Sequence, residues 1–150
     1  MINLNTIEKT ATYTEIIKKS KFITYLYPLT SLEHAKNIIE KHKQEHADAT
    51  HVCYAYILDN LKKESDDGEP SGTAGIPMLQ VLEKNNLNHV LCIVVRYFGK
   101  IKLGAGGLVR AYTHSANLVL GEENLIEMKK FQYMDIIIIG MLLIWHCLNG

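Results

Sequence analysis

The sequence predicts an α/β (α+β) two-layer sandwich, in which helices cover one face of a sheet. Strand-like and helix-like segments follow one another in the order β-β-α-β-α-β-α. A length of 150 residues is enough for one hydrophobic core and short for two domains. Three of the ten glycines lie in Ser65–Pro77 and four more in Arg96–Tyr112, which predicts two glycine-rich loops between these elements.

The first half of the chain predicts a hairpin, a helix and a buried strand. Two runs rich in Thr, Tyr and Ile flank the polar stretch Lys18–Lys21, which is typical of a hairpin turn. Ser31 is a favourable N-cap, and apolar residues recur after it at helical spacing. The predicted segments are strands at 10–17 and 22–29, a helix at 31–47 and a strand at 50–58.

The second half predicts two helices and the central strand of the sheet. Val90–Val95 is an unbroken apolar run with many β-branched residues, as expected of a strand buried on both faces. Pro77 is tolerated because it falls in the first turn of a helix. The predicted segments are a helix at 76–84, a strand at 89–98 and a helix that follows the second loop and continues to about residue 120.

Composition limits the function classes. The 16 Lys and Arg balance the 16 Asp and Glu, which argues against capture of nucleic acid or a membrane by the whole surface. The distribution is uneven, because no carboxylate occurs between Glu83 and Glu122, so the second loop lies in a basic segment. The three cysteines are far apart and no apolar leader follows a basic start, so we expect a cytoplasmic protein without disulfides.

The chain end does not fit the repeating pattern. Residues 1–130 are assigned to the main domain and residues 131–150 to an apolar tail. The apolar run 136–148 is shorter than the roughly 20 residues that span a bilayer, so no membrane contact is expected. We expect it to be a strand that begins a truncated second domain or an altered chain end. The alternatives are a packed terminal strand and a contact between copies of the chain.

The second glycine-rich loop predicts an anion-binding site. Its glycines precede a helix, whose N-terminal N–H groups carry partial positive charge and attract phosphate. The spacing matches neither the P-loop nor the dinucleotide fingerprint, so a loop whose glycines only form turns is the alternative. The candidate nucleic-acid or anion-binding residues are Arg96, Tyr97, Phe98, Lys100, Lys102, Gly104, Gly106, Gly107 and Arg110.

The first glycine-rich loop predicts the opposite wall of a cleft shared with the basic loop. Its carboxylates are also compatible with a divalent cation or with acid–base chemistry, but its residues are typical of turns, and Ser71 or Thr73 would cap the helix that follows. We therefore expect no metal, no cofactor and no catalytic residue. The candidate wall residues are Asp66, Asp67, Gly68, Glu69, Pro70, Ser71, Gly72 and Thr73.

One further pattern matches a catalytic motif formally, and a second brings a histidine and a cysteine together on one strand. His42–His46 reads H-x-x-E-H, the inverted zinc-protease pattern, but it lies at a polar helix end and no third ligand can be named. His51 and Cys53 share one face of a strand, yet no orienting carboxylate or oxyanion hole is identifiable. Solvated helix residues and a core cysteine are the favoured interpretations.

The two loops together resemble the signature of the IMPACT/YigZ family, in its N-terminal Impact domain. The motifs read "DDGEPSGTAGIP" from Asp66, "RYFGKIKLGAGGLVRAY" from Arg96, "ATHVCYAY" from Ala49 and "KKSKF" from Lys18. The resemblance implies a fold like the second domain of a small-subunit ribosomal protein. It also implies bacterial relatives that are stand-alone cytoplasmic proteins, and eukaryotic relatives implicated in translational control through a nutrient-sensing kinase pathway.

Two departures from the family pattern stand out. Lys100 replaces the second glycine of the family's "RYFGG", which costs about 1 kcal/mol if that position needs a positive φ. Bacterial relatives usually continue into a ferredoxin-like domain, whereas this sequence ends after the apolar tail. Activities that need both domains are therefore not expected of this chain alone.

The leading functional hypothesis is a non-enzymatic, translation-associated module that binds RNA or the surface of a ribosome or translation factor. Phosphates would contact the cations of the second loop, and its aromatic pair would stack on bases. The first alternative is an enzyme or binder of a phosphorylated small molecule, with Asp66 or Asp67 holding magnesium. The second alternative is a purely protein-binding surface.

Overall fold

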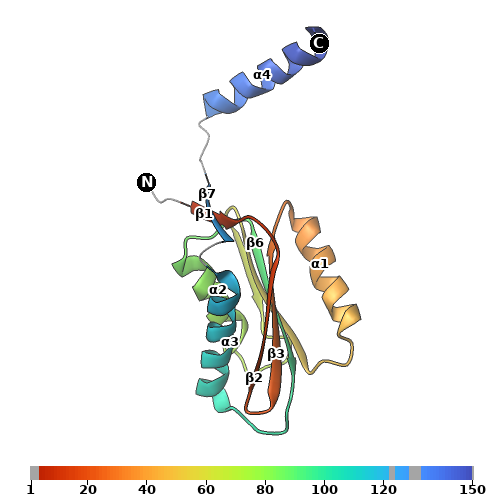
Figure 1. Ribbon diagram of the computed structural model, residues 1–150, viewed down its shortest axis with the longest axis vertical. Helices are drawn as coiled ribbons and strands as arrows, with labels where there is room; N and C mark the ends of the chain where they lie inside the picture. The colour runs from red at the N-terminus through yellow and green to blue at the C-terminus, as the bar shows by residue number, and fades with distance from the viewer. Residues whose placement is uncertain (1–3, 122–123, 129–132, 150) are drawn as a thin grey trace.

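A computed structural model describes residues 4–121, 124–128 and 133–149, and its main feature is an antiparallel sheet of five strands (Figure 1). The sheet has the order β2-β3-β6-β4-β5. β6 is inserted between two strands that precede it in sequence, which confirms the prediction of a central strand. The strands are β2 (Ala11–Ile17), β3 (Ser20–Pro28), β4 (His51–Leu58), β5 (Leu61–Ser65) and β6 (Val90–Tyr97).

Helices cover both faces of this sheet. α1 (Leu32–Glu45) lies on one face, whereas α2 (Gly75–Lys84) and α3 (Gly104–Leu120) lie on the other (Figure 1). Alternate residues of β6 divide between the two cores, with Cys92 and Val94 facing α2 and α3, and Ile93 and Val95 facing α1. The predicted α+β fold is confirmed, and α1 adds a layer to the predicted two-layer sandwich.

The register of the three central strands places Arg96 between two residues of its neighbouring strands. Arg96 of β6 pairs with Phe22 on β3 and with His51 on β4, so the three residues form one row across the sheet. Side chains in one row of paired strands point to the same face. All three therefore face α3, near the end of β6 from which the second glycine-rich loop leaves.

Three short strands were not predicted. β5 has the polar sequence LKKES and is stabilised by pairing with β4 at the sheet edge. β1 (Leu4–Ile7) and β7 (Leu125–Met128) form a separate two-stranded sheet from opposite ends of the chain. Four-residue strands carry almost no periodicity, and their pairing depends on a contact more than 100 residues apart in sequence.

The apolar tail forms a helix, α4 (Tyr133–Asn149), so the prediction of a strand there is wrong. A continuous apolar run has no period that separates helix from strand. The side chains described for residues 141–149 are exposed. In the described part of the chain, no helix combines the length and apolarity needed to cross a membrane. Contact between copies through this tail stays a prediction.

Lys100 occupies a left-handed backbone conformation with φ of 68°. A side chain with a Cβ is strained there, and glycine is not. We expect Lys100→Gly to raise the free energy of unfolding by about 1 kcal/mol, measured by urea denaturation. The control is Lys102→Gly, which removes the same charge where φ is not positive. That substitution should lower stability, and a similar effect of both variants would contradict the assignment of strain to Lys100.

Candidate functional site

The two glycine-rich loops meet at a cavity of about 400 Å³. One wall comes from the start of β4 and the first loop, and the other from the end of β6, the second loop and the first turns of α3. Both glycine-rich loops therefore contribute lining residues to one cavity. Its lining residues are Thr50, His51, Glu69, Pro70, Arg96, Phe98, Lys102, Leu103, Gly104, Ala105 and Leu108.

A buried ion pair joins the two walls. Arg96 Nη1 donates to Glu69 Oε1 at 2.6 Å, and the side chains are only 6% and 2% exposed. The Tyr112 hydroxyl donates to the same carboxylate oxygen at 2.7 Å. The Arg96 guanidinium lies 5.5 Å from the ring centroids of both Phe22 and Phe98. The charge of Arg96 is thus neutralised inside the protein, which leaves little of it for a phosphate.

Ser20 links this pair to the second loop. Its buried hydroxyl accepts from Arg96 Nη2 at 3.3 Å and from the Gly99 amide at 3.1 Å. Gly99 lies so close to the β2–β3 turn that a Cβ built on it would be 2.0 Å from the carbonyl oxygen of Lys19. The hairpin turn and the second loop are therefore in direct backbone contact.

His51 extends the polar group along the cavity wall. Its Nδ1–H donates to the carbonyl oxygen of Asp67 at 2.8 Å, and its Nε2 lies 3.6 Å from Glu69 Oε2. Cys53 is buried below it, where burial raises the pKa of the thiol, which donates to the Asp66 carbonyl oxygen at 3.0 Å. The thiol stays protonated at neutral pH, so these contacts do not support a Cys–His nucleophile.

The Asp66 carboxylate accepts hydrogen bonds from backbone amides of the first loop and of α2. It accepts from the amides of Gly72, Ala74 and Gly75 at 2.9 to 3.0 Å, and so caps α2 in place of Ser71 or Thr73. Burial raises the pKa of Asp66, but the three N–H donors outweigh it and the pKa is lowered overall. Asp67 Oδ2 accepts from the Val52 amide at 2.6 Å. These bonds occupy both oxygens of the Asp66 carboxylate and one oxygen of Asp67.

The remaining wall residues shape the first loop. Gly68 and Gly72 adopt positive φ values of 87° and 80°, as turns require. The Thr73 hydroxyl donates to the Pro70 carbonyl oxygen at 2.6 Å. Ser71 is exposed. Glu69 and Pro70 are the members of the predicted wall that line the cavity.

The predicted aromatic pair is split between the two faces of the sheet. Tyr97 faces α1, where its hydroxyl is 2.8 Å from His46 Nδ1 and donates to Asp48 Oδ1 at 3.2 Å. Phe98 lies at the cavity and is 43% exposed. Successive residues of a strand point to opposite faces, so the adjacent positions of Tyr97 and Phe98 in the sequence were a signal that the two rings would separate.

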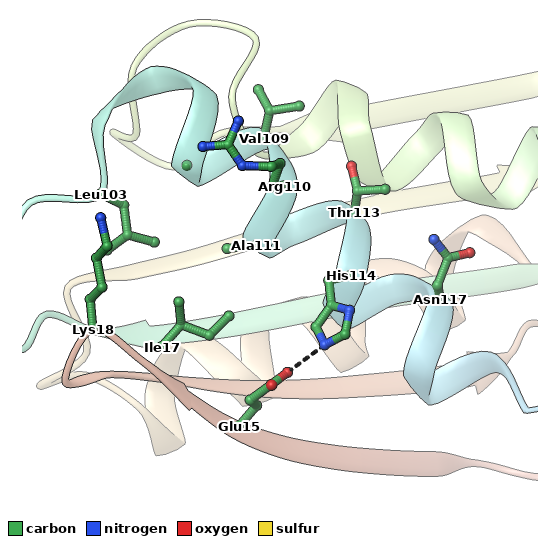
Figure 2. A pocket seen from close by; sticks show the side chains of 11 residues that line it. Glu15, Ile17, Lys18, Leu103, Val109, Arg110, Ala111, Thr113, His114 and Asn117 are labelled. Atoms are coloured by element: carbon green, nitrogen blue, oxygen red, sulfur yellow. Dashed lines mark ion pairs between the residues drawn. The ribbon is translucent and has the colours of Figure 1, made fainter.

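A second cavity of about 650 Å³ lies between the β2–β3 hairpin and α3. Figure 2 shows Lys18 and Arg110 near Leu103 at one end of it, while His114 pairs with Glu15 at 3.0 Å farther along. Gly107 lines the cavity, and Gly106 lies beside the Arg110 guanidinium. The hairpin lysines were not predicted as site residues, although "KKSK" marks a cationic turn.

Folding thus gathers exposed cations from segments far apart in sequence. Two come from the β2–β3 hairpin turn, two from the second glycine-rich loop and one from α3. The hairpin turn contacts the second loop at Gly99. Near them, Glu69 is paired with Arg96, and Glu15 with His114. We call this region the basic surface, defined as Lys18, Lys19, Lys100, Lys102 and Arg110.

A family model described as the Impact N-terminal domain matches residues 18–120. The chain belongs to the IMPACT family. An IMPACT family member of Bacillus subtilis, YvyE, is 44% identical over 132 residues, or 86% of this chain and 61% of the relative. The Escherichia coli member YigZ is 46% identical over 114 residues, or 73% of this chain and 56% of the relative. The chain thus spans somewhat more than half the length of these IMPACT relatives.

The IMPACT fold is supported by a solved structure. The crystal structure of a hypothetical protein aligns with a TM-score of 0.78 and 40% identity, covering 87% of this chain and 65% of that one. The structure of the two-domain translational regulator Yih1 aligns at a TM-score of 0.44 and 22% identity, too low to support an inference about this chain. The matched Impact segment includes every residue that lines the first cavity.

Proposed function

We propose that this chain is a translation-associated binding module that holds single-stranded RNA on the basic surface. The observation that carries this proposal is the convergence of five exposed cations beside a helix N-terminus, where nearby carboxylates are already paired. Backbone phosphates are the ligand that such a surface attracts most strongly. The association with translation rests on membership of the IMPACT family and on what the resemblance to it implies.

The N-terminus of α3 supplies neutral donors to the same ligand. Gly104, Ala105 and Gly106 are exposed. The N-cap residue, Leu103, makes no side-chain hydrogen bond to the helix, and the described first turn contains no acidic residue. Free N–H groups and the positive end of the helix dipole favour a phosphate at this position. Lys102 would then neutralise the same phosphate from the preceding residues of the loop.

Phe98 is the group placed to stack on a base. Its exposed ring lies at the cavity, and the Arg96 guanidinium lies over the ring, 5.5 Å from its centroid. Stacking of a base on an aromatic side chain contributes about 1–3 kcal/mol and tolerates any sequence. Arg96 acts here by positioning Phe98 and by joining the loops.

Charge reversal on the basic surface tests this function. We expect Lys100→Glu/Lys102→Glu to weaken binding of a labelled single-stranded RNA at least tenfold at low salt, measured by fluorescence anisotropy. Log affinity falls with log salt, and each lost phosphate contact makes this fall shallower by about 0.7 in slope. The double variant should therefore reduce the magnitude of the slope by about 1.4. The matched control is Lys36→Glu/Lys63→Glu, which changes the same charge at exposed positions on α1 and β5.

The outcomes separate the alternatives. Equal losses in both double variants would mean that net charge, and not this surface, governs binding. Absence of RNA binding by the unaltered protein at low salt would overturn the proposal in favour of a protein partner. Magnesium-dependent affinity for a free nucleotide, without salt-dependent RNA binding, would instead favour a phosphorylated small molecule.

A further inference from the structure

A second polar cluster lies at the C-terminal end of α1, on the sheet face opposite α3. It consists of His42, Glu45 and His46, which are one helical turn apart. One nitrogen from each imidazole and one carboxylate oxygen lie within 4.8 Å of one another. The basic surface does not include these residues, and neither cavity described above is lined by them.

His42 has an unsatisfied buried nitrogen. The residue is only 3% exposed, its Nε2 is hydrogen-bonded to the Tyr27 hydroxyl, and its Nδ1 has no partner among the described residues. Buried polar atoms are rarely left unpaired, because an unmade bond costs free energy. A neutral imidazole has one N–H and one lone pair, so an Nε2–H donated to the Tyr27 hydroxyl would leave the lone pair on Nδ1.

The surroundings of His46 select its tautomer. The Tyr97 hydroxyl donates to Asp48 Oδ1 at 3.2 Å, so its oxygen accepts the Nδ1–H of His46 at 2.8 Å. The lone pair is then on Nε2, whose nearest described partner is the Tyr25 hydroxyl at the long distance of 3.4 Å. A hydrogen bond that orients a histidine through its second nitrogen is usual behind a metal-binding imidazole, and here the Tyr97 hydroxyl, itself bonded to Asp48, provides it.

We propose that His42, Glu45 and His46 bind one divalent transition-metal ion of the zinc class. The ligands are Nδ1 of His42, Nε2 of His46 and a carboxylate oxygen of Glu45, with water as the fourth. Two imidazoles and a carboxylate suit zinc, whereas magnesium and calcium prefer oxygen ligands alone. The bound ion would tie the last turn of α1 to Tyr27 on β3 and Tyr97 on β6 through the two histidines.

Binding requires a modest rearrangement. Tetrahedral zinc with bonds of about 2.0–2.2 Å separates its ligand atoms by about 3.3–3.6 Å, and the three candidate atoms lie within 4.8 Å of one another. The two imidazole rings are parallel within 1° with centroids 6.0 Å apart, so one ring must turn to place the ion in both ring planes. His46 is the less confined ring, because it is half-buried and lies at the C-cap, and a tilt about its Nδ1–H to Tyr97 bond changes the ring plane without breaking that bond.

Zinc binding is tested by titrating the unaltered protein with zinc sulfate in competition with a chromophoric chelator. We expect one equivalent to bind, and His46→Ala to weaken the affinity at least tenfold. Tyr97→Phe, which removes no ligand, should weaken it about tenfold by releasing the orientation of His46. The matched control is His114→Ala, since His114 and Glu15 form a partly exposed histidine–carboxylate pair to which the described residues add no third ligand.

The melting temperature provides a second readout. Zinc should raise it in the unaltered protein and in His114→Ala, and should leave it unchanged in His46→Ala. Circular dichroism of each variant without zinc shows whether it is folded, and Glu45→Gln repeats the test if His46→Ala is not. Absence of a bound equivalent, or equal weakening in His46→Ala and His114→Ala, would overturn the proposal.

Discussion

Glu69→Ala is expected to lower the free energy of unfolding by about 3–5 kcal/mol, the cost of leaving one charge of a buried pair uncompensated. The Arg96 guanidinium would remain buried without its carboxylate, and the Tyr112 hydroxyl would lose its acceptor. Urea or guanidinium denaturation measures this loss. The control is Glu83→Ala, which breaks an exposed pair with Lys62 at 3.3 Å and should cost less than about 1 kcal/mol.

A double replacement shows whether such a loss of stability comes from the uncompensated charge of Arg96 or from lost packing around it. Glu69→Leu/Arg96→Met removes both charges together and leaves apolar side chains in the same space, which is often neutral for stability. We therefore expect the double variant to be more stable than Glu69→Ala. If both variants are equally unstable, the loss comes from packing around Phe22 and Tyr112, and the assignment to an uncompensated charge is wrong.

Gly99→Ala is expected to destabilise the protein by about 3 kcal/mol, at the upper end of the cost of overpacking. The added methyl group would lie 2.0 Å from the Lys19 carbonyl oxygen and 2.1 Å from the carbonyl carbon, and backbone atoms cannot rotate away. The β2–β3 turn and the second loop must then separate. Because they carry opposite halves of the basic surface, we expect RNA affinity to fall with stability.

Gly106→Ala is the matched control for that substitution. Its added Cβ would be 3.3 Å from Arg110 Nη1, the far end of a flexible side chain, within the first turn of α3. Alanine favours a helix over glycine by up to about 1 kcal/mol, so stability should be unchanged or slightly higher. Equal destabilisation by both substitutions in thermal melts would argue against the close approach at Gly99.

Much of the fold was predictable from local patterns. The hairpin, α1, β4, α2, β6 and α3 were each predicted, since apolar periodicity and capping residues such as Ser31 act within a few neighbours. The prediction failed for the apolar tail, where α4 has no usable period. It also missed β5, which depends on its partner strand.

Less of the candidate site was predictable. The two loops were identified as its walls. Arg96 and Arg110 were both expected to bind an anion, but the structure gives them different surroundings. Arg96 is neutralised by a carboxylate 27 residues earlier, whereas Arg110 is exposed beside the hairpin turn. The alternating faces of a strand were the available signal that Tyr97 and Phe98 would part.

By itself the sequence determined the central strand, the helices that pack on it, the two glycine-rich loops and the resemblance to the IMPACT family. Each depends on residues close together along the chain, where sterics and periodicity act directly. Only the tertiary structure decided which charges are paired, which cations converge and which histidine nitrogens are left free. Those outcomes depend on strand order and register, which place Lys19 against Gly99 and Glu69 against Arg96 and so decide which groups water can reach.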